Sequence, residues 1–490
     1  MRLRHRLSVP SPLLACGLLL SCLACSRPAK VVLDGIPGDV VAAFDRARAA
    51  PAADLRITSI ADGAVIPRNH ACPLIEWRAD GTGDSVFLLE LRSHRRALDV
   101  FLKGRRWQPE GREFERFLSG REVRIRVYRQ AAAGVTASDT VRVAIAPRPL
   151  GDRIAFRVVQ PLFNPTLPNA VEVFAFGRPR PARFVEFADT CVGCHVYGAA
   201  SAFLNVKRGS ERRLVSAQRT GDAVQLRGRD LGAFSFLALS PDGRHAAYVH
   251  APVGDLVLKD TLVEPFDYPY SAADIHVLDT TTGATWPLAG ASDPNVVEDM
   301  PAFSADGTRL IFSRYRMEET DGVKVIPGMA LAELPFNEGR GGVAVPLAGT
   351  TAAGSWHYFA RYSPDGRWIS FCRGDGRNGI YARRSGDIYL MSVAGRRVMR
   401  LSLNAEGSMD SWHSWAADSH WLAFSSNREA SGLTALYLAY VDDDGNASPP
   451  VKLVGFDAMK VNTPQFVPEA LDLASLGDVA PFVEAVFETP

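Results

Sequence analysis

The chain has 490 residues, 47% hydrophobic and 22% charged, which excludes a disordered chain and leaves room for two or three globular domains. Its 55 lysines and arginines balance 54 aspartates and glutamates, for a net charge of +1. Because the two signs interleave and form no basic stripe, nucleic acid is excluded as an expected partner.

Residues 1–25 have the pattern of an export signal. Arginines precede a short apolar run at 13–20, and small residues and cysteines follow it. The run is too short to span a membrane. Leu19-Leu20-Ser21-Cys22 resembles a bacterial lipobox, which makes Cys22 the predicted lipidation site and Cys25 the alternative. A plain cleaved signal peptide is the other possibility.

The signal places the protein in the bacterial periplasm, held to a membrane by a lipid anchor and not by a spanning helix. No aspartate follows Cys22 or Cys25. By resemblance to lipoprotein sorting, this indicates the outer membrane.

Residues 26–51 are predicted to form a tether with one short helix at 40–44. From 52 to 147, segments with the period of two that strands require occur at 55–58, 86–91, 123–128 and 141–145. Trp77 is the expected core aromatic. The spacing resembles an immunoglobulin or fibronectin type III sandwich, a module that usually binds a partner or separates other domains. This segment contains no recognisable set of catalytic residues.

From about residue 150 to residue 470 the sequence repeats itself. Four units each contain a strand, a tight turn and a second strand, and a third and a fourth strand follow. The turn aspartates are Asp242, Asp306, Asp365 and Asp418. Residues that tolerate a positive φ make such short hairpins, and four antiparallel strands per unit predict a propeller blade. The repeat is longer than the roughly 40–45 residues of WD repeats.

The Ser-Pro-Asp-Gly turns and the later Asp-Ile-Tyr-Leu strand resemble the repeats of TolB-like six-bladed propellers, over residues 233–456. The resemblance implies two more blades. Residues 199–225 predict a degenerate one. Residues 154–175 predict three strands of another, whose innermost strand would come from 462–467 and close the ring. The predicted fold class is all-β, a sandwich followed by a six-bladed propeller, with 471–490 as a C-terminal tail.

Inside this repeat region lies Cys191-Val192-Gly193-Cys194-His195. Two thiols three residues apart, followed by a histidine, is the spacing that attaches a haem through both sulfurs and binds its iron through the imidazole. The alternatives are an exposed disulfide, half of a zinc site and a thioredoxin-like pair. Outside the predicted signal, whose Cys22 and Cys25 have the same spacing, no second Cys-x-x-Cys occurs, and no βαβ alternation surrounds the motif, so the last two alternatives have no support. Cys72 and Cys372 stand alone, and Cys372 is expected in the core.

The whole architecture resembles a family of exported bacterial lipoproteins in which a TolB-like propeller carries one such motif. The predicted cofactor is therefore one haem c per chain, attached at Cys191 and Cys194 with His195 as axial ligand. Aligning the blades on the aromatic residue expected to open each first strand puts His195 in register with His413, at one mouth of the channel. The sixth-ligand candidates at that mouth are His413 and Met300, then His357 and Met409, and each has the alternative role of capping the channel.

These observations predict a membrane-anchored mono-haem protein for electron transfer or redox sensing, with an unidentified periplasmic redox or envelope protein as partner. The alternative is a TolB-like scaffold that binds a protein or glycan, in which haem is structural or absent. A hydrolase is disfavoured because no Gly-x-Ser-x-Gly elbow occurs. A haem enzyme with an open iron site stays open as an alternative.

Overall fold

The computed structural model describes residues 28–46, 49–81, 85–110, 112–131, 134–159, 169–187, 190–251, 272–320, 323–375, 384–429, 431–456 and 459–488. The predicted signal peptide, with Cys22 and Cys25, lies outside the described residues. Within those ranges no helix is both long enough and apolar enough to cross a membrane.

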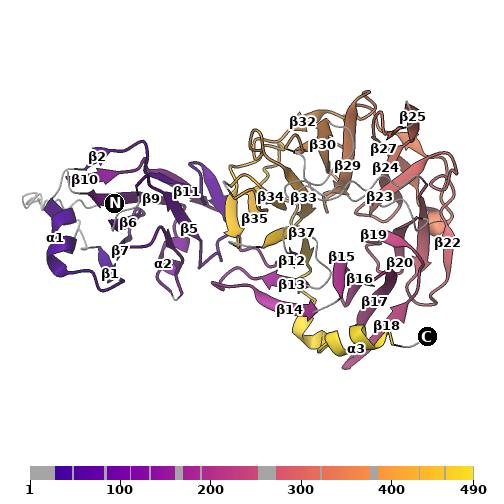
Figure 1. Ribbon diagram of the computed structural model, residues 1–490, viewed down its shortest axis with the longest axis horizontal. Helices are drawn as coiled ribbons and strands as arrows, with labels where there is room; N and C mark the ends of the chain where they lie inside the picture. The colour runs from indigo at the N-terminus through magenta and orange to yellow at the C-terminus, as the bar shows by residue number, and fades with distance from the viewer. Residues whose placement is uncertain are drawn as a thin grey trace, which may run out of the picture.

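The N-terminal domain consists of two sheets that share one core (Figure 1). The larger sheet contains β1 (Ala29–Val32), β2 (Ala50–Pro51), β4 (Ala64–Ile66), β6 (Val86–Arg92), β7 (Ala97–Leu102), β9 (Glu122–Ala131), β10 (Gly134–Ala137) and β11 (Val141–Ile145). The smaller contains β3 (Arg56–Ile57), β5 (Ile75–Arg78) and β8 (Arg106–Trp107), and a short helix, α2 (Glu115–Leu118), precedes β9. All four predicted segments form strands, and Trp77 is buried in the shared core, as predicted.

The segment predicted as a tether belongs to this domain, which corrects the prediction. β1 pairs in parallel with β7, and β2 pairs in parallel with β10. The predicted helix is present as α1 (Gly38–Arg46), and its Phe44 packs edge-on against Phe101 at 5.7 Å between ring centroids. Strand pairing and the burial of Phe44 hold this segment in the domain. The sequence did not predict this, because the segment has no long periodic pattern.

Six four-stranded antiparallel sheets in the described residues form the blades of the propeller around a central channel (Figure 1). From the innermost strand outward, blade 1 is β37 (Lys460–Val467), β12 (Arg153–Val159), β13 (Asn169–Phe174) and β14 (Ala182–Phe187); blade 2 is β15 (Cys191–Tyr197), β16 (Ser201–Arg208), β17 (Glu211–Thr220) and β18 (Ala223–Arg229); blade 3 is β19 (Phe234–Leu239), β20 (His245–His250), β21 (Asp274–Asp279) and β22 (Thr285–Pro287).

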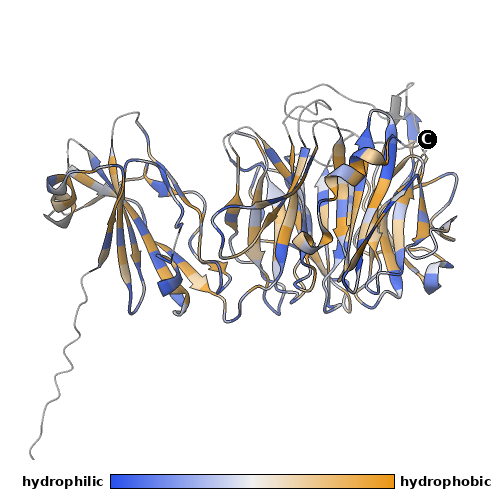
Figure 2. Ribbon diagram, turned by 90° about the horizontal axis from the view of Figure 1, so that it is seen from below, coloured by the Kyte–Doolittle hydropathy of each residue, from blue (hydrophilic) through white to orange (hydrophobic). Residues whose placement is uncertain are grey.

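Blade 4 is β23 (Val297–Phe303), β24 (Arg309–Tyr315), β27 (Ala330–Pro335) and β28 (Val345–Pro346); blade 5 is β29 (Ser355–Tyr362), β30 (Trp368–Asp375), β31 (Asp387–Ser392) and β32 (Val398–Arg400); blade 6 is β33 (Asp410–Trp415), β34 (Trp421–Ser426), β35 (Ala435–Tyr440) and β36 (Val451–Val454). A small hairpin, β25 (Glu318–Thr320) with β26 (Val323–Val325), extends from blade 4, and η1 (Asn337–Gly339) follows β27. Figure 2 shows the N-terminal domain and the propeller side by side, with apolar residues along the strands.

The repeated turns owe their shape to a local hydrogen-bond pattern. In blade 3, Ser240 Oγ donates to Asp242 Oδ1 at 2.6 Å, and the same oxygen accepts the backbone N–H of Arg244. Gly243 follows with φ of 72°, a conformation that side chains with a Cβ rarely adopt. The same serine–aspartate contact recurs at Asp306. Each of these turns joins the innermost strand of its blade to the second strand.

The ring closes as predicted. β37, from the end of the chain, pairs antiparallel with β12 and supplies the innermost strand of blade 1. The following segment is not a free tail. η2 (Leu473–Leu476) and α3 (Ala480–Ala485) pack against blades 1 and 2, burying Leu473, Leu476 and Val483 in a shared cluster.

Candidate channel site at the Cys-x-x-Cys-His motif

Each innermost strand of the propeller carries a bulge that turns side chains toward the channel. The ladder with the second strand is interrupted in all six blades. In five blades the first residue of the bulge has a positive φ, between 42° and 55°: Phe236, Met300, Phe359, Trp412 and Thr463. Bulges of this kind re-aim side chains and are frequent beside functional sites.

The haem-type motif occupies the bulge of β15. Its ladder is interrupted between Val192 and His195, so Gly193 and Cys194 form the bulge. In blade 6 the interruption falls between Ser411 and Ser414. The hydrogen-bond register therefore aligns Cys194, and not His195, with His413. The alignment made from sequence is one residue out because the turn after β15 is shorter than the other blade turns.

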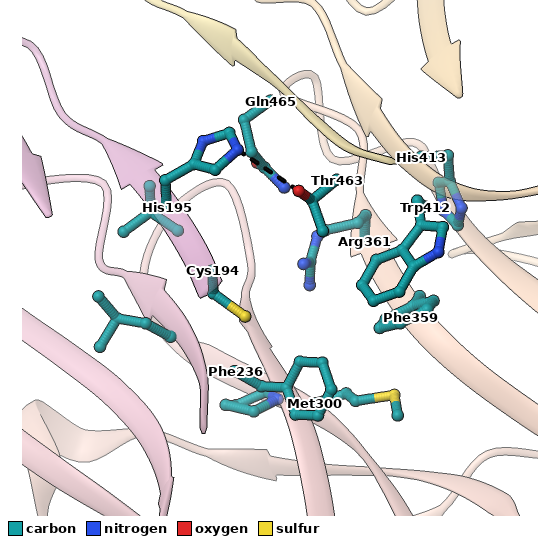
Figure 3. A pocket seen from close by; sticks show the side chains of 13 residues that line it. Cys194, His195, Phe236, Met300, Phe359, Arg361, Trp412, His413, Thr463 and Gln465 are labelled. Carbon is teal, nitrogen blue, oxygen red and sulfur yellow. Dashed lines mark hydrogen bonds between the residues drawn. The ribbon is translucent and has the colours of Figure 1, made fainter. Parts of the chain in front are cut away.

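A small cavity of about 30 Å³ lies beside this bulge. Cys194 and His195 line it from blade 2, and Met300 and His413, the two favoured sixth-ligand candidates, line it from blades 4 and 6 (Figure 3). His357 and Met409 are buried but are not among the described lining residues. The His357 ring Nδ1 lies instead 3.0 Å from the carbonyl oxygen of Met329. The sequence thus brings four of its predicted site residues together.

Cys191 lies apart from this group. Its side chain is only 8% exposed, and the Arg157 Nη2 donates to its sulfur at 3.4 Å. Arg157 belongs to β12 of blade 1, so Cys191 packs toward blade 1 and not among the residues that line the cavity. Cys191 and Cys194 are both free thiols. The disulfide alternative is therefore not the arrangement found here.

The two histidines of the cavity are neutral imidazoles at pH 7. Burial, and next the positive charge of Arg157, lowers the pKa of His195 to about 3. Burial, and next the charge of Arg361, lowers the pKa of His413 to about 3. His195 Nε2 lies 3.5 Å from the Thr463 hydroxyl, and His195 Nδ1 is buried without a hydrogen-bond partner among the described residues. That orphaned nitrogen points to a group that the protein itself does not supply.

His413 has a neighbour that the sequence did not predict. Its Nδ1 lies 3.5 Å from the sulfur of Cys372, which is 3.4 Å from the Ser411 hydroxyl. Burial raises the pKa of Cys372 to about 12, so it is a thiol and not a thiolate. Cys372 is a core residue, as predicted, but it also holds the His413 ring. No sequence signal indicates the pair, because β30 and β33 belong to different blades.

The residues present do not fit a haem in this arrangement. A cavity needs about 10–15 Å³ to hold one water, so about 30 Å³ takes a group of one or two waters and not a tetrapyrrole. The two thiols do not line one cavity, and His413 is already held by Cys372. Among the described residues no group of three His, Cys, Asp or Glu side chains is arranged to hold a metal ion. Haem attachment stays a prediction.

A second candidate site is an open polar cleft of about 630 Å³ between blades 4 and 5, on the face of the Asp-Gly turns. At its base the Glu333 carboxyl, 4% exposed, pairs with Arg309 and with Arg396 and accepts the Tyr362 hydroxyl. Burial favours the neutral acid, but the hydrogen bonds from Arg309 and Tyr362 outweigh it and lower the pKa of Glu333. Arg396 Nη1 is buried without a partner in the described part of the chain.

No protein-family model and no curated protein matches this chain. Solved structures that resemble it include TolB from Acinetobacter baumannii, with 12% identity over 71% of this chain and 79% of that one and a TM-score of 0.43. A putative TolB from Agrobacterium tumefaciens is 14% identical over 65% of this chain and 99% of that one, with a TM-score of 0.38. An oligogalacturonate lyase from Vibrio parahaemolyticus is 13% identical over 63% of this chain and 78% of that one, with a TM-score of 0.36. These similarities are too distant to bear on function, and the blade count rests on the strand pairings.

Proposed function

We propose that this protein is an exported envelope scaffold whose propeller binds a protein partner through the cleft between blades 4 and 5. One observation carries the proposal. The channel site is closed and water-sized, whereas the cleft offers about 630 Å³ of open, polar space on the turn face. The export signal and the predicted lipid anchor at Cys22 support a periplasmic location for such a scaffold.

The cleft presents charges of both signs on rigid elements. Arg309 and Glu333 project from strands of blade 4, and Tyr362 from the innermost strand of blade 5. Asp306 and Asp365 come from the two Asp-Gly turns. Arg396, which lines the cleft and pairs with Glu333, supplies a guanidinium that suits a carboxylate or carbonyl of an incoming segment. A polypeptide with mixed polar groups suits this surface better than a purely anionic ligand.

Site-specific crosslinking on cells tests the proposal. A photoreactive residue at Val393, which lines the cleft, is expected to give one discrete envelope-protein adduct. The same residue at Val343, which is 80% exposed but is not among the described residues that line the cleft, is the matched control. The adduct should weaken in Arg396→Gln and persist in Cys191→Ala/Cys194→Ala. Equal labelling from both positions, or binding only to isolated cell-wall glycan, would refute a protein partner at the cleft.

Electron transfer by a covalently bound haem is the second candidate, favoured by the spacing of Cys191, Cys194 and His195 and by the orphaned His195 nitrogen. An absorption spectrum of protein made in a host with haem-attachment machinery decides the matter. A covalently retained haem band that disappears in the double cysteine variant would support electron transfer over the scaffold.

A further inference from the structure

The channel cavity contains a guanidinium with no carboxylate partner. Arg361, on β29, projects among the side chains of the cavity, between Cys194 on one side and Trp412 on the other (Figure 3). Its Nη1 donates to the carbonyl oxygen of Ala360 at 3.2 Å. No ion pair joins Arg361 to any carboxylate of the described residues. A charge that is partly removed from water and has no such partner is unfavourable.

Two buried carboxyl groups on the innermost strands of blades 4 and 6 are not partners of this charge. Asp410 is committed to Arg428, at 2.6 Å. Asp299 is buried, and its Oδ1 accepts the backbone N–H of Met300. Burial raises the pKa of Asp299 to about 7, so a large share of it is uncharged at neutral pH.

A second arginine adds to the positive field. Arg157 reaches Cys191 from blade 1, and its Nε is buried without a hydrogen-bond partner in the described chain. No ion pair joins it to a described carboxylate either. The charges of Arg157 and Arg361 both act on Cys194 and favour its thiolate, although burial outweighs them and raises the pKa of that thiol. One guanidinium therefore lines the site and the charge of a second acts on it from blade 1, and neither has a carboxylate partner among the described residues.

The rest of the cavity lining is rich in neutral donors. Thr463 contributes a hydroxyl and Gln465 an amide, both from β37, and His195 contributes a neutral ring with one unpartnered nitrogen (Figure 3). Phe236, Phe359 and Trp412 form apolar walls on the other sides. Hydrogen-bond donors around a cation, inside an apolar shell, form an anion site.

We propose that the propeller channel binds one halide-sized inorganic anion at Arg361, with the Gln465 amide and the Nδ1–H of His195 as additional donors, while the Thr463 hydroxyl donates to His195 Nε2 and so fixes that tautomer. The cavity of about 30 Å³ sets the size limit, since it takes a group comparable to one or two waters and excludes phosphate esters and carboxylate metabolites. This inference is independent of the cleft and of haem attachment.

Thermal unfolding of the full mature protein in sodium chloride, against sodium gluconate of equal ionic strength, tests the site. Chloride binds only the folded state at this site, so it should raise Tm with a saturable concentration dependence. Arg361→Met should lose this response and should be more stable than the wild type in gluconate, because the unpaired and partly buried charge is gone. Arg112→Met, at a side chain that is 91% exposed, is the control and should keep the chloride response.

A crystal of the wild type soaked in sodium bromide gives a second readout that does not depend on folding of a variant. The expected result is an anomalous peak beside the Arg361 guanidinium. An equal chloride response in the wild type and Arg361→Met, or a channel without a bromide peak, would overturn the proposal.

Discussion

Asp299 is a carboxyl group that the fold keeps away from water and gives only one hydrogen bond. It is 1% exposed, its Oδ1 accepts the Met300 N–H at 2.8 Å, and its Oδ2 has no partner among the described residues. Burial raises its pKa to about 7. The unfolded chain ionises this residue near pH 4 while the folded chain holds the proton to about pH 7. Folding stability is therefore lost as pH rises from 4 to 7, and the loss is constant above that.

Asp299→Asn should remove this loss, because the amide oxygen can still accept the Met300 N–H and carries no charge. We expect the variant to be more stable than the wild type by about 2 kcal/mol at pH 8. The gain should be close to zero at pH 4. Urea unfolding between pH 4 and pH 8 measures it, with the fully exposed Asp222→Asn as control. A stability difference that does not change with pH would contradict the argument.

Single positions differ in how well the sequence predicts them. Trp77 and Cys372 could be placed in the core because each stands in a strand with apolar neighbours. The contact of Cys372 with His413 could not be predicted, because the two residues belong to different blades. The separation of Cys191 from Cys194 could not be predicted either, since the one-residue offset of the bulge in β15 comes from its short turn.

At the scale of elements, β37 and the segment after it hold the ring closed. β37 gives blade 1 its innermost strand, and Leu476 and Val483 pack behind blades 1 and 2 with 1% and 0% exposure. An additional contact is the ion pair of Arg208 with Glu484. The sequence predicted this strand at 462–467, because blade 1 lacked an innermost strand. Residues 472–485 have no repeat partner, and their packing could be found only in the structure.

Leu476→Ala should lower the free energy of unfolding by about 2–5 kcal/mol, because it leaves a cavity in a fully buried cluster. Deletion of 460–488 should have a larger effect and prevent a cooperative thermal transition, since blade 1 then lacks its innermost strand. Calorimetry measures both. Glu488→Ala, near the end of the same segment, is the control. A truncated chain that still unfolds in one sharp transition would show that the ring does not depend on this closure.

At the scale of the molecule, the order of a sandwich and a propeller follows from two kinds of periodicity, and both kinds were visible in the sequence. How the two units join was not visible, because the junction uses residues outside the repeats. Ile60 forms a bridge with Val451 of blade 6. His70 of the N-terminal domain is 1% exposed and packs edge-on against Phe174 and Phe176, at 5.9 and 5.6 Å between ring centroids.

Lys452 is the charged centre of this junction and the place to test it. Its ammonium lies 2.7 Å from Glu76 of the N-terminal domain and 2.8 Å from Glu429 of blade 6, while its side chain is only 6% exposed. Its backbone N–H also donates to the carbonyl of Ser59. Removing one member of a buried ion pair leaves the remaining charges unpaired, which lowers the folding stability by more than the intact pair adds to it.

Lys452→Met should therefore destabilise the protein by about 2 kcal/mol, because Glu76 and Glu429 then face each other without a cation, although both stay partly solvated. The substitution should also weaken the contact between the N-terminal domain and the propeller. Small-angle scattering is expected to show a larger radius of gyration, and proteolysis should become faster in the 146–152 connection. Arg142→Met, which removes the exposed ion pair with Asp62, should change neither. An unchanged radius and cleavage rate in Lys452→Met would mean that apolar contacts such as His70 with Phe174 suffice to dock the domain.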